Sequence, residues 1–258
     1  MLLTEDLIDG LHAFRIAMMR QFVESHRIGR PDAIGRAIGG GYATYPGFGS
    51  LLTQAYGIGH RDAKFDLAEL DEFYEGRADN WELIVTPFDS QSVLREAFKA
   101  GYVPDHFEAV LGQIVGIVDS ETTDGIRIEL VEGDLSLWAR VSEAGWTGTD
   151  ELPDEPGEFA RFTTEAPSKR YLAWIDGEPA ATAGLVEIDG KFLFGGASTR
   201  PQFRHRGLQS ALSRRRLADA GPGSFTQVVA LPGSQSHRNL QRIAFAPLYS
   251  KLVLFRRE

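Results

Sequence analysis

A chain of 258 residues can form one large domain or two small ones, and its apolar fraction of 43% is ordinary for a globular protein. The net charge of −9 argues against general nucleic-acid binding, which needs a basic surface. Because the chain has no cysteine, disulfides, zinc–thiolate sites and a cysteine nucleophile are excluded.

The N-terminus reads as the start of a helix. Met1 to Asp6 carries early acidic residues and lacks the basic region of a signal peptide. The sequence has no apolar run that approaches the roughly 18 residues of a membrane span. We therefore expect a cytoplasmic protein that makes no membrane contact.

The N-terminal half mixes helical and strand patterns. The first forty residues have the apolar spacing of a helix, with Thr4 as its N-cap. The glycine-rich segment 39–49 is expected to form turns, because it lacks the Lys–Ser/Thr pair of a nucleotide-binding loop. Further along, the pattern predicts helices over 67–74 and 91–100, and strands over 81–85 and 107–112.

The C-terminal half has a more regular order. The acidic stretch 119–124 predicts a domain boundary, with one domain over 1–119 and a second over 124–258. Two Asp–Gly pairs separate strands expected at 170–175, 180–188 and 191–198, as in an antiparallel meander. The elements expected next are a helix over 207–220, a strand over 225–230, a short helix capped by Ser234 or Ser236, and a strand over 249–255.

The connection between the third meander strand and the following helix has the composition of an anion site. Its residues are Arg204, His205, Arg206, Gly207, Leu208 and Gln209. Backbone N–H groups at a helix start are unpaired, and arginine adds positive charge, so a pyrophosphate can bind there. An ordinary strand-to-helix turn with solvated arginines is the alternative interpretation.

The Arg204-x-x-Gly207-x-Gln209 spacing resembles the acyl-CoA pyrophosphate loop of the GNAT superfamily of N-acetyltransferases. The order of elements from Tyr171 to Tyr249 is similar to that of the family. The segment 232–240, followed by a phenylalanine at 245, resembles its second cofactor motif.

Two positions depart from the family pattern. Gln209 stands where the family usually has Gly or Ala, which affects how closely the helix start approaches the phosphates. Ala244 stands where the family usually has Gly. We expect this second change to matter little, because alanine only mildly restricts the backbone.

The resemblance implies a fold and a co-substrate. The fold would be α/β, of the α+β kind, with a GNAT-like mixed sheet flanked by helices and two tandem GNAT-like domains. Acetyl-CoA would be the co-substrate, and no metal is implied. The residues implied to hold acetyl-CoA are Ala197, Ser198 and Thr199 beside the pantetheine arm, the amides from Arg204 through Gln209 at the pyrophosphate, and Asn239.

The resemblance also implies catalytic roles. Tyr249 matches the tyrosine that protonates the CoA thiolate, and the alternative is a half-buried structural tyrosine. Glu187 is the nearest carboxylate that could take the proton of the amine, against the alternative of a solvent-facing strand residue. Lys251 is expected to be a solvated edge residue. Within the run 214–216, which is typical of a solvated helix face, Arg215 falls on the inward stripe.

The N-terminal half lacks the pyrophosphate motif but echoes the C-terminal half, since Gly101-Tyr102 is similar to Ala244-Phe245. It is interpreted as a degenerate GNAT-like domain, or alternatively as a helical cap that shapes the acceptor pocket. The function predicted is transfer of an acetyl group from acetyl-CoA to an amine of a small molecule or peptide, by direct attack in a ternary complex. The alternative is a non-catalytic acyl-CoA sensor or regulator. The expected partners are acyl-CoA and the amine acceptor, without nucleic acid, and a homodimer is left open.

Overall fold

The computed structural model describes residues 3–50, 52–118 and 125–256. The chain packs into two compact units: unit 1 is Met1–Val110, Ala230–His237 and Pro247–Glu258, and unit 2 is Leu111–Val229 and Arg238–Ala246. The boundary expected at 119–124 lies outside the described residues, and the division into 1–119 and 124–258 stays a prediction. The chain's C-terminal strand packs within the unit that is built mainly from the N-terminal half.

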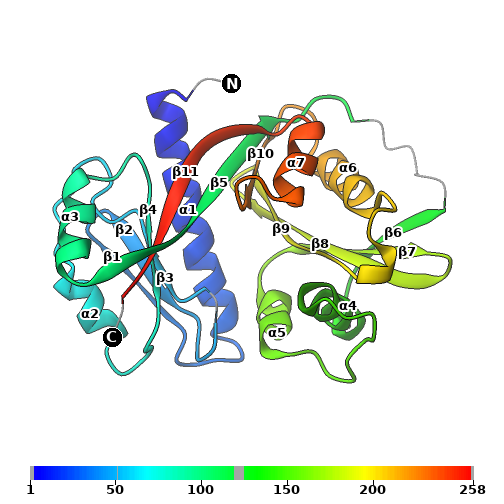
Figure 1. The fold of residues 1–258 in the computed structure, drawn as a ribbon, viewed down its shortest axis with the longest axis horizontal. Coiled ribbons are helices and arrows are strands. Elements are labelled where there is room, and N and C mark those ends of the chain that lie inside the picture. The colour runs from blue at the N-terminus through cyan, green and yellow to red at the C-terminus, as the bar shows by residue number, and fades with distance from the viewer. Residues whose placement is uncertain (1–2, 51, 119–124, 257–258) are drawn as a thin grey trace. The chain divides into compact units, whose positions relative to one another are not determined.

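Unit 1 is a mixed sheet with helices on both faces (Figure 1). Its helices are α1 (Glu5–His26), α2 (Ala68–Tyr74) and α3 (Gln91–Lys99), and its strands are β1 (Ile34–Ile38), β2 (Gly41–Tyr45), β3 (Gln54–Tyr56), β4 (Glu82–Val85), β5 (Tyr102–Ile114) and β11 (Ala246–Arg256). The strand order is β1-β2-β3-β4-β11-β5, with β3 parallel to β4 and β11 antiparallel to β4. This sheet excludes the alternative of a purely helical cap.

Local signals explain most of these elements. Thr4 caps α1, since its Oγ1 accepts a hydrogen bond from the Leu7 amide at 3.3 Å, and Ser90 caps α3 in the same way from Ser92 at 3.4 Å. The helix predicted over the first forty residues ends at His26 and is wrong beyond it. The glycines at 39 and 40 form the turn of the β1–β2 hairpin.

The two faces of the unit 1 sheet differ in character. The face under α2 and α3 buries an apolar core that includes Leu70, Val93 and Leu83. The face under α1 carries polar side chains: Arg15 of α1 donates from Nη2 to Oε1 of Gln54 on β3 at 2.9 Å. Because successive side chains point to opposite faces of a sheet, one strand contributes apolar side chains to one face and polar side chains to the other.

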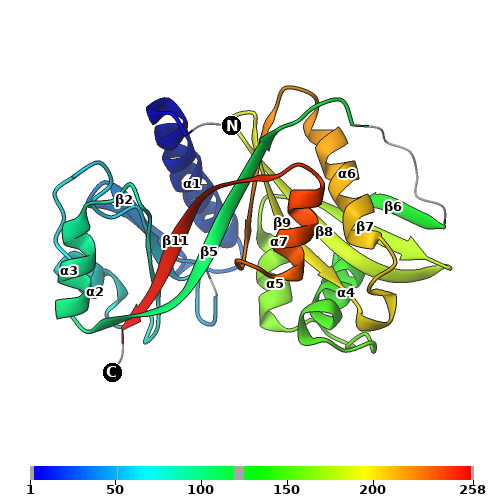
Figure 2. The ribbon, with the colours of Figure 1, turned by 45° about the horizontal axis from the view of Figure 1, so that its top comes forward.

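The strands of unit 2 also pair in both parallel and antiparallel directions, and helices cover both of their faces (Figure 2). Its further elements are β6 (Ile126–Val131), α4 (Ser136–Thr147), α5 (Glu158–Glu165), β7 (Lys169–Ile175), β8 (Glu178–Ile188), β9 (Lys191–Thr199), the 3-10 turn η1 (Pro201–Phe203), α6 (Leu208–Ala220), β10 (Phe225–Ala230) and α7 (Gln235–Arg242). The order is β5-β10-β9-β8-β7-β6, in which β5 contributes its residues from Leu111 on. Mixed strand pairing flanked by helices in both units confirms the predicted α/β fold.

The meander β7–β8–β9 forms as the sequence predicts. Asp176 and Asp189 both have positive φ, 54° and 49°, and the glycine after each has φ of 80° or 71°. Two successive residues with positive φ make the hairpin turn that fits the twist of antiparallel strands. On one face of the meander Trp138 of α4 packs with Leu172, and on the other the Tyr171 hydroxyl donates to Asp219 of α6 at 2.7 Å.

The arginine that faces inward from α6 is the residue next to the one expected. The buried residue is Arg216, not Arg215, which pairs with Asp219 at 3.1 Å. Burial lowers the pKa of Arg216 to about 9, and its guanidinium lies 4.0 Å from the centre of the Phe194 ring. Arg216 also donates to the carbonyl of Gly184 at 3.2 Å, so it is a structural residue of unit 2.

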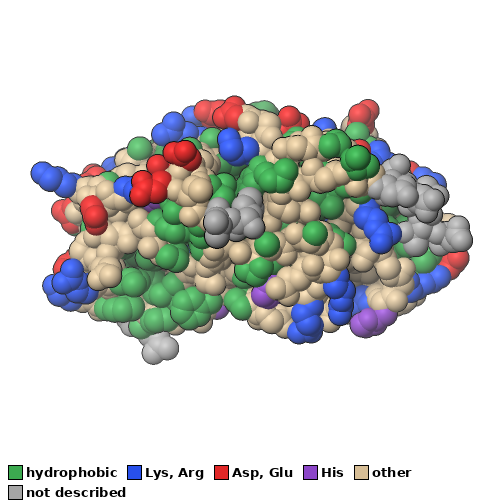
Figure 3. All heavy atoms as spheres, turned by 90° about the horizontal axis from the view of Figure 1, so that it is seen from above, with side chains coloured by type: hydrophobic (Ala, Val, Ile, Leu, Met, Phe, Trp, Pro, Cys, Tyr) green, Lys and Arg blue, Asp and Glu red, His purple; other side chains and the backbone are tan. Residues whose placement is uncertain are grey.

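Two surface properties bear on partners. Among the described helices, α1 included, none has the length and apolar character needed to cross a membrane. On the face drawn in Figure 3, Lys and Arg side chains are scattered among acidic and apolar ones.

Candidate functional site

Strand β9 changes its path just before the predicted cofactor loop. Its antiparallel register with β8 runs from Lys191 to Gly195 and resumes at Ser198, opposite Thr182. Gly196 and the alanine after it therefore lie opposite a single residue of β8, which is a β-bulge. Gly196 has φ of 55°, a conformation that glycine adopts without strain.

β9 also extends past its other neighbour. The parallel register with β10 runs from Lys191–Phe225 to Phe194–Val228, whereas β9 continues to Thr199. Ala197 is exposed in this final stretch. Backbone groups beyond a strand's partner can pair with an extended ligand as with an added strand. The end of β9 is thus shaped to receive one.

The loop after β9 ends in an open helix start. Residues 204–207 are exposed, and Gly207 adopts a left-handed conformation with φ of 81° immediately before α6. The N-cap of α6 provides no side-chain hydrogen bond. The first amides of α6 have no intrahelical acceptor, and the helix dipole adds partial positive charge there. Phosphate is the kind of group that such a helix start binds.

The loop arginines are engaged with the protein. Arg204 donates from Nε to the carbonyl of Thr199 at 3.2 Å and from Nη2 to that of Gly145 at 3.1 Å. Arg206 pairs with Asp176 at 2.8 Å on the surface. Arg204 therefore shapes the loop, and the backbone amides are the direct donors available to an anion.

Gln209 fastens the helix start to the end of β9. Its Nε2 donates to the carbonyl of Ser198 at 3.1 Å and to Oγ1 of Thr199 at 2.8 Å. Behind them α4 approaches closely, because a Cβ on Gly145 would lie 2.6 Å from the Ser198 Oγ. A role for glutamine at this position, where the family usually has Gly or Ala, follows from these bonds. The side chain of Gln209 binds the end of β9, while its backbone amide stays in the first turn of α6.

Asn239 lies on the part of α7 that belongs to unit 2, and its Oδ1 accepts a hydrogen bond from Arg242 at 2.7 Å. The following turn is fixed by Phe245, which is buried 5.3 Å from the centre of the Phe194 ring on β9. Ala244 has φ of 71°, in the left-handed region. The expectation that alanine is harmless here is wrong, because a side chain in this conformation costs about 1 kcal/mol.

Tyr249 lies on β11 and belongs to unit 1, whereas the acetyl-CoA residues predicted from the resemblance belong to unit 2. It is half-buried, with its ring 5.1 Å from that of Phe88. Burial raises the pKa of Tyr249 above its usual range, and the neighbouring Tyr56 hydroxyl acts against this rise. A phenol in this state is fully protonated at neutral pH, as a proton donor must be. Its catalytic role stays a prediction.

Lys251, two residues further along β11, is buried, so the expectation of a solvated edge residue is wrong. Its Nζ lies 2.7 Å from Oε2 of Glu108 on β5. Burial, together with Arg15, lowers the pKa of Lys251 to about 8. Burial, together with Glu108, raises the pKa of Glu82 on the neighbouring strand β4. Buried Lys251 and these two half-buried carboxyl groups make the α1 face of unit 1 an ionisable layer.

Glu187 is not brought to the loop. It is exposed on β8 and lies opposite Phe192, near the start of β9. The five residues from there to Ala197 span roughly 17 Å of strand. The role of Glu187 as the base stays a prediction that its position does not favour.

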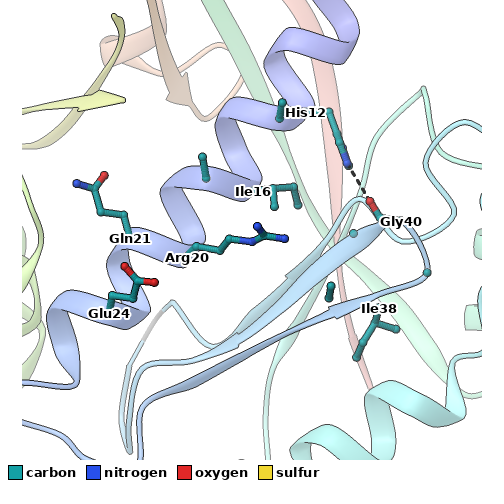
Figure 4. A pocket seen from close by; sticks show the side chains of 12 residues that line it. His12, Ile16, Arg20, Gln21, Glu24, Ile38 and Gly40 are labelled. Atoms are coloured by element: carbon teal, nitrogen blue, oxygen red, sulfur yellow. Dashed lines mark hydrogen bonds between the residues drawn. The ribbon is translucent and has the colours of Figure 1, made fainter. Parts of the chain in front are cut away.

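Two grooves lie in unit 1. One of about 720 Å³ runs along α1 against the β1–β2 hairpin, where His12 bonds to the Gly40 carbonyl at 3.0 Å (Figure 4). The other, about 770 Å³, lies between the segment 62–67 and α3. The residues that line them do not include the loop of unit 2. Within the described ranges, no group of three His, Asp or Glu side chains is arranged to hold a metal ion.

Sequence comparison finds no match to a family model or to a curated protein. Structure comparison does find similar folds. A GCN5-related N-acetyltransferase from Kribbella flavida matches with a TM-score of 0.66 and 18% identity over 96% of both chains. A GNAT-family protein from Novosphingobium aromaticivorans matches with a TM-score of 0.58 and 21% identity over 92% of this chain and 97% of that one.

A tandem GNAT protein from the clavulanic acid biosynthesis pathway matches over 96% of this chain and 94% of its own, with a TM-score of 0.58 and 12% identity. These matches cover both units. They establish the GNAT fold for the chain and confirm the fold that the Arg204-x-x-Gly207 motif predicted.

Proposed function

We propose that the chain is an N-acetyltransferase that binds acetyl-CoA at the end of β9 and the start of α6. The observation that carries the proposal is Gly207, a left-handed glycine at an uncapped and exposed helix start directly after a bulged strand end. The amides of the first turn of α6 would hold the pyrophosphate, and the backbone from Ala197 to Thr199 would pair with the pantetheine arm.

In the proposed reaction an amine nitrogen of the acceptor attacks the carbonyl carbon of the thioester. The carbon–sulfur bond then breaks, and the sulfur leaves with the electron pair. Tyr249 is the proposed donor of the proton to this sulfur, which leaves CoA as a free thiol. The amine loses its own proton to solvent. A cysteine nucleophile is not required, in agreement with the absence of cysteine from the sequence.

The proposal is tested by titrating the protein with acetyl-CoA in a calorimeter and then measuring release of free CoA with a panel of amines. We expect saturable binding, and CoA release that depends on one class of amine. Tyr249→Phe should keep the affinity for acetyl-CoA and lose most of the turnover. Binding without release across the panel would favour the sensor, and absence of binding would refute both. Cytoplasmic location and the oligomeric state stay predictions from the sequence.

A further inference from the structure

The end of β9 is attached to its neighbours in unit 2 by hydroxyl groups. Oγ of Ser198 donates to the Ser142 carbonyl on α4 at 3.2 Å and lies 3.0 Å from Oγ1 of Thr182 on β8. Ser198 and Thr182 are both buried, so water does not compete with these contacts. They hold β9 to β8 and to α4, and neither contact involves α6.

The attachment to α6 comes from Gln209, the second residue of that helix. Its Nε2 donates to the Ser198 carbonyl at 3.1 Å and to Oγ1 of Thr199 at 2.8 Å. A primary amide has two N–H donors, so these two bonds use both. The glycine or alanine usual in the family has no donor for either bond. Gln209 thus contributes its backbone amide to the open helix start and its side chain to the end of β9.

Arg204 ties the connecting loop in a different direction. Its guanidinium bonds to the carbonyls of Thr199 and Gly145, which belong to β9 and α4. The loop 200–207 separates the end of β9 from α6, and its residues 204–207 are exposed. Exposed loops change conformation more easily than the elements they join. The bonds of Gln209 bypass this loop and fix the strand end directly to the helix start.

We propose that Gln209 is a positioning residue that sets the spacing between the two halves of the acetyl-CoA site, an inference that rests on the proposed function. The first-turn amides of α6 bind the pyrophosphate, and the end of β9 pairs with the pantetheine arm. A ligand with both parts binds more tightly when the halves are already held at its own spacing. A ligand with the phosphates alone does not depend on that spacing. Gln209 therefore selects ligands in which a diphosphate is joined to an extended arm.

Gln209→Met tests the spacing, because methionine keeps the length and volume of the side chain and removes both N–H donors. Calorimetric titration compares acetyl-CoA with adenosine 3′-phosphate 5′-diphosphate, the half of CoA that carries the phosphates. We expect the variant to bind acetyl-CoA about tenfold more weakly and the phosphate half within about twofold of the wild type. The matched control is Gln91→Met, which changes an exposed glutamine in the first turn of α3 and should alter neither affinity.

A second variant approaches the contact from the strand. Thr199→Val removes one of the two acceptors of Gln209 and should weaken acetyl-CoA binding by a smaller factor. Added to Gln209→Met it should cause no further loss, because that bond is already absent. Hydrogen exchange of the protein without ligand gives an independent readout. Amides in the segment 197–204 should exchange faster in Gln209→Met than in Gln91→Met.

The outcomes separate this inference from the proposed function. An equal loss for acetyl-CoA and its phosphate half would assign Gln209 to the anion site alone and overturn the inference, as would unchanged affinity for both. Unchanged exchange in 197–204 would also overturn it, because β9 would then be fixed without Gln209. A wild type that does not bind acetyl-CoA refutes the proposed function and the selection of ligands with it, whatever the exchange shows.

Discussion

In unit 1 the parallel strands β3 and β4 are joined through α2, and in unit 2 the parallel strands β9 and β10 are joined through α6. The two connections have the same order of strand, loop, helix and strand. They differ in what occupies the space beyond the strand ends. In unit 2 an exposed loop and an uncapped helix start follow β9. In unit 1 the loops that follow β3 and β4 are hydrogen-bonded to each other.

In unit 1 hydrogen bonds join the loop after β3 to the loop after β4. His60 and Asp89 form an isolated antiparallel bridge, and the Ser90 amide donates to the Gly59 carbonyl at 2.9 Å. The segment after β3 is thereby tied to the segment after β4. These contacts use backbone N–H and C=O groups beyond the ends of β3 and β4. The corresponding groups at the end of β9 lie past its last pair with β10.

The helix starts differ in the same sense. In unit 1 the Asp66 carboxylate accepts a hydrogen bond from the Ala68 amide at 2.9 Å, and α2 has acidic residues in its first turn. In unit 2 the first turn of α6 has no acidic residue, and Gly207 provides no cap. A carboxylate at a helix start occupies the place where a phosphate would bind. One topology thus yields a closed helix start in unit 1 and an open one in unit 2.

The largest expected effect comes from changing one left-handed glycine in each connection. Gly207→Val should weaken acetyl-CoA binding by more than about 100-fold, because a β-branched residue cannot hold φ of 81° and the amides would turn away. Its effect on stability should be smaller, since the space around Gly207 is open. Calorimetric titration and thermal unfolding measure the two effects.

The matched change is Gly59→Val in unit 1. A Cβ there would lie 2.5 Å from Cγ2 of Val93, so the variant should unfold at a lower temperature and bind acetyl-CoA normally. If Gly59→Val abolished binding while Gly207→Val did not, the assignment of open and closed connections would be reversed.

The buried cation of unit 1 predicts a pH effect on stability. Lys251 has a folded pKa of about 8, below its ordinary value of 10.5, so between these values the unfolded chain binds more protons. The free energy of unfolding should therefore rise with pH in this window, by up to about 1.4 kcal/mol per pH unit. Lys251→Met should remove this slope. The control Lys99→Met changes a lysine whose side chain is 71% exposed and should keep it.

The close approach of α4 to β9 predicts a third effect. Gly145→Ala places a Cβ 2.8 Å from the Thr199 amide, which should displace the strand end, weaken acetyl-CoA binding about tenfold and destabilise unit 2. Gly10→Ala is the matched control on α1, because a Cβ there meets no atom within 4 Å. Equal affinities for the two variants would argue against a role for the end of β9.

The smallest expected effect concerns the two helix ends that are similar in sequence, Gly101-Tyr102 and Ala244-Phe245. Gly101 has φ of 86° after α3, and Ala244 has φ of 71° after α7. Ala244→Gly should stabilise the protein by about 1 kcal/mol, and Gly101→Ala should destabilise it by a similar amount. Chemical denaturation of both variants measures the difference. A stabilising Gly101→Ala would contradict the equivalence of the two turns.

Much of unit 2 could be predicted because its signals are local. The Asp–Gly turns, the cap at Ser234 and the glycine before α6 act within a few residues, so sequence alone places the meander and α6. In unit 1 the short strands β1, β2 and β3 were missed. β3 has only the residues Gln54–Tyr56, and its pattern cannot be told from a loop until neighbouring strands define it.

The polar contacts of unit 1 were beyond sequence reasoning for a different reason. The sequence predicts Lys251 as a solvated edge residue of the last strand. Its burial against Glu108 depends on the C-terminal strand belonging to unit 1. This pair has no signal in sequence spacing.

The most direct test of the central claim is hydrogen exchange of the full chain with and without saturating acetyl-CoA, followed by mass spectrometry. If the open connection of unit 2 binds the co-substrate, amides in the segment 195–211 should exchange more slowly in its presence, while those in 57–68 should be unchanged. Slowing confined to 57–68, or to the α3 start near Ser90, would show that the connection interpreted as closed is the binding site and would contradict the account.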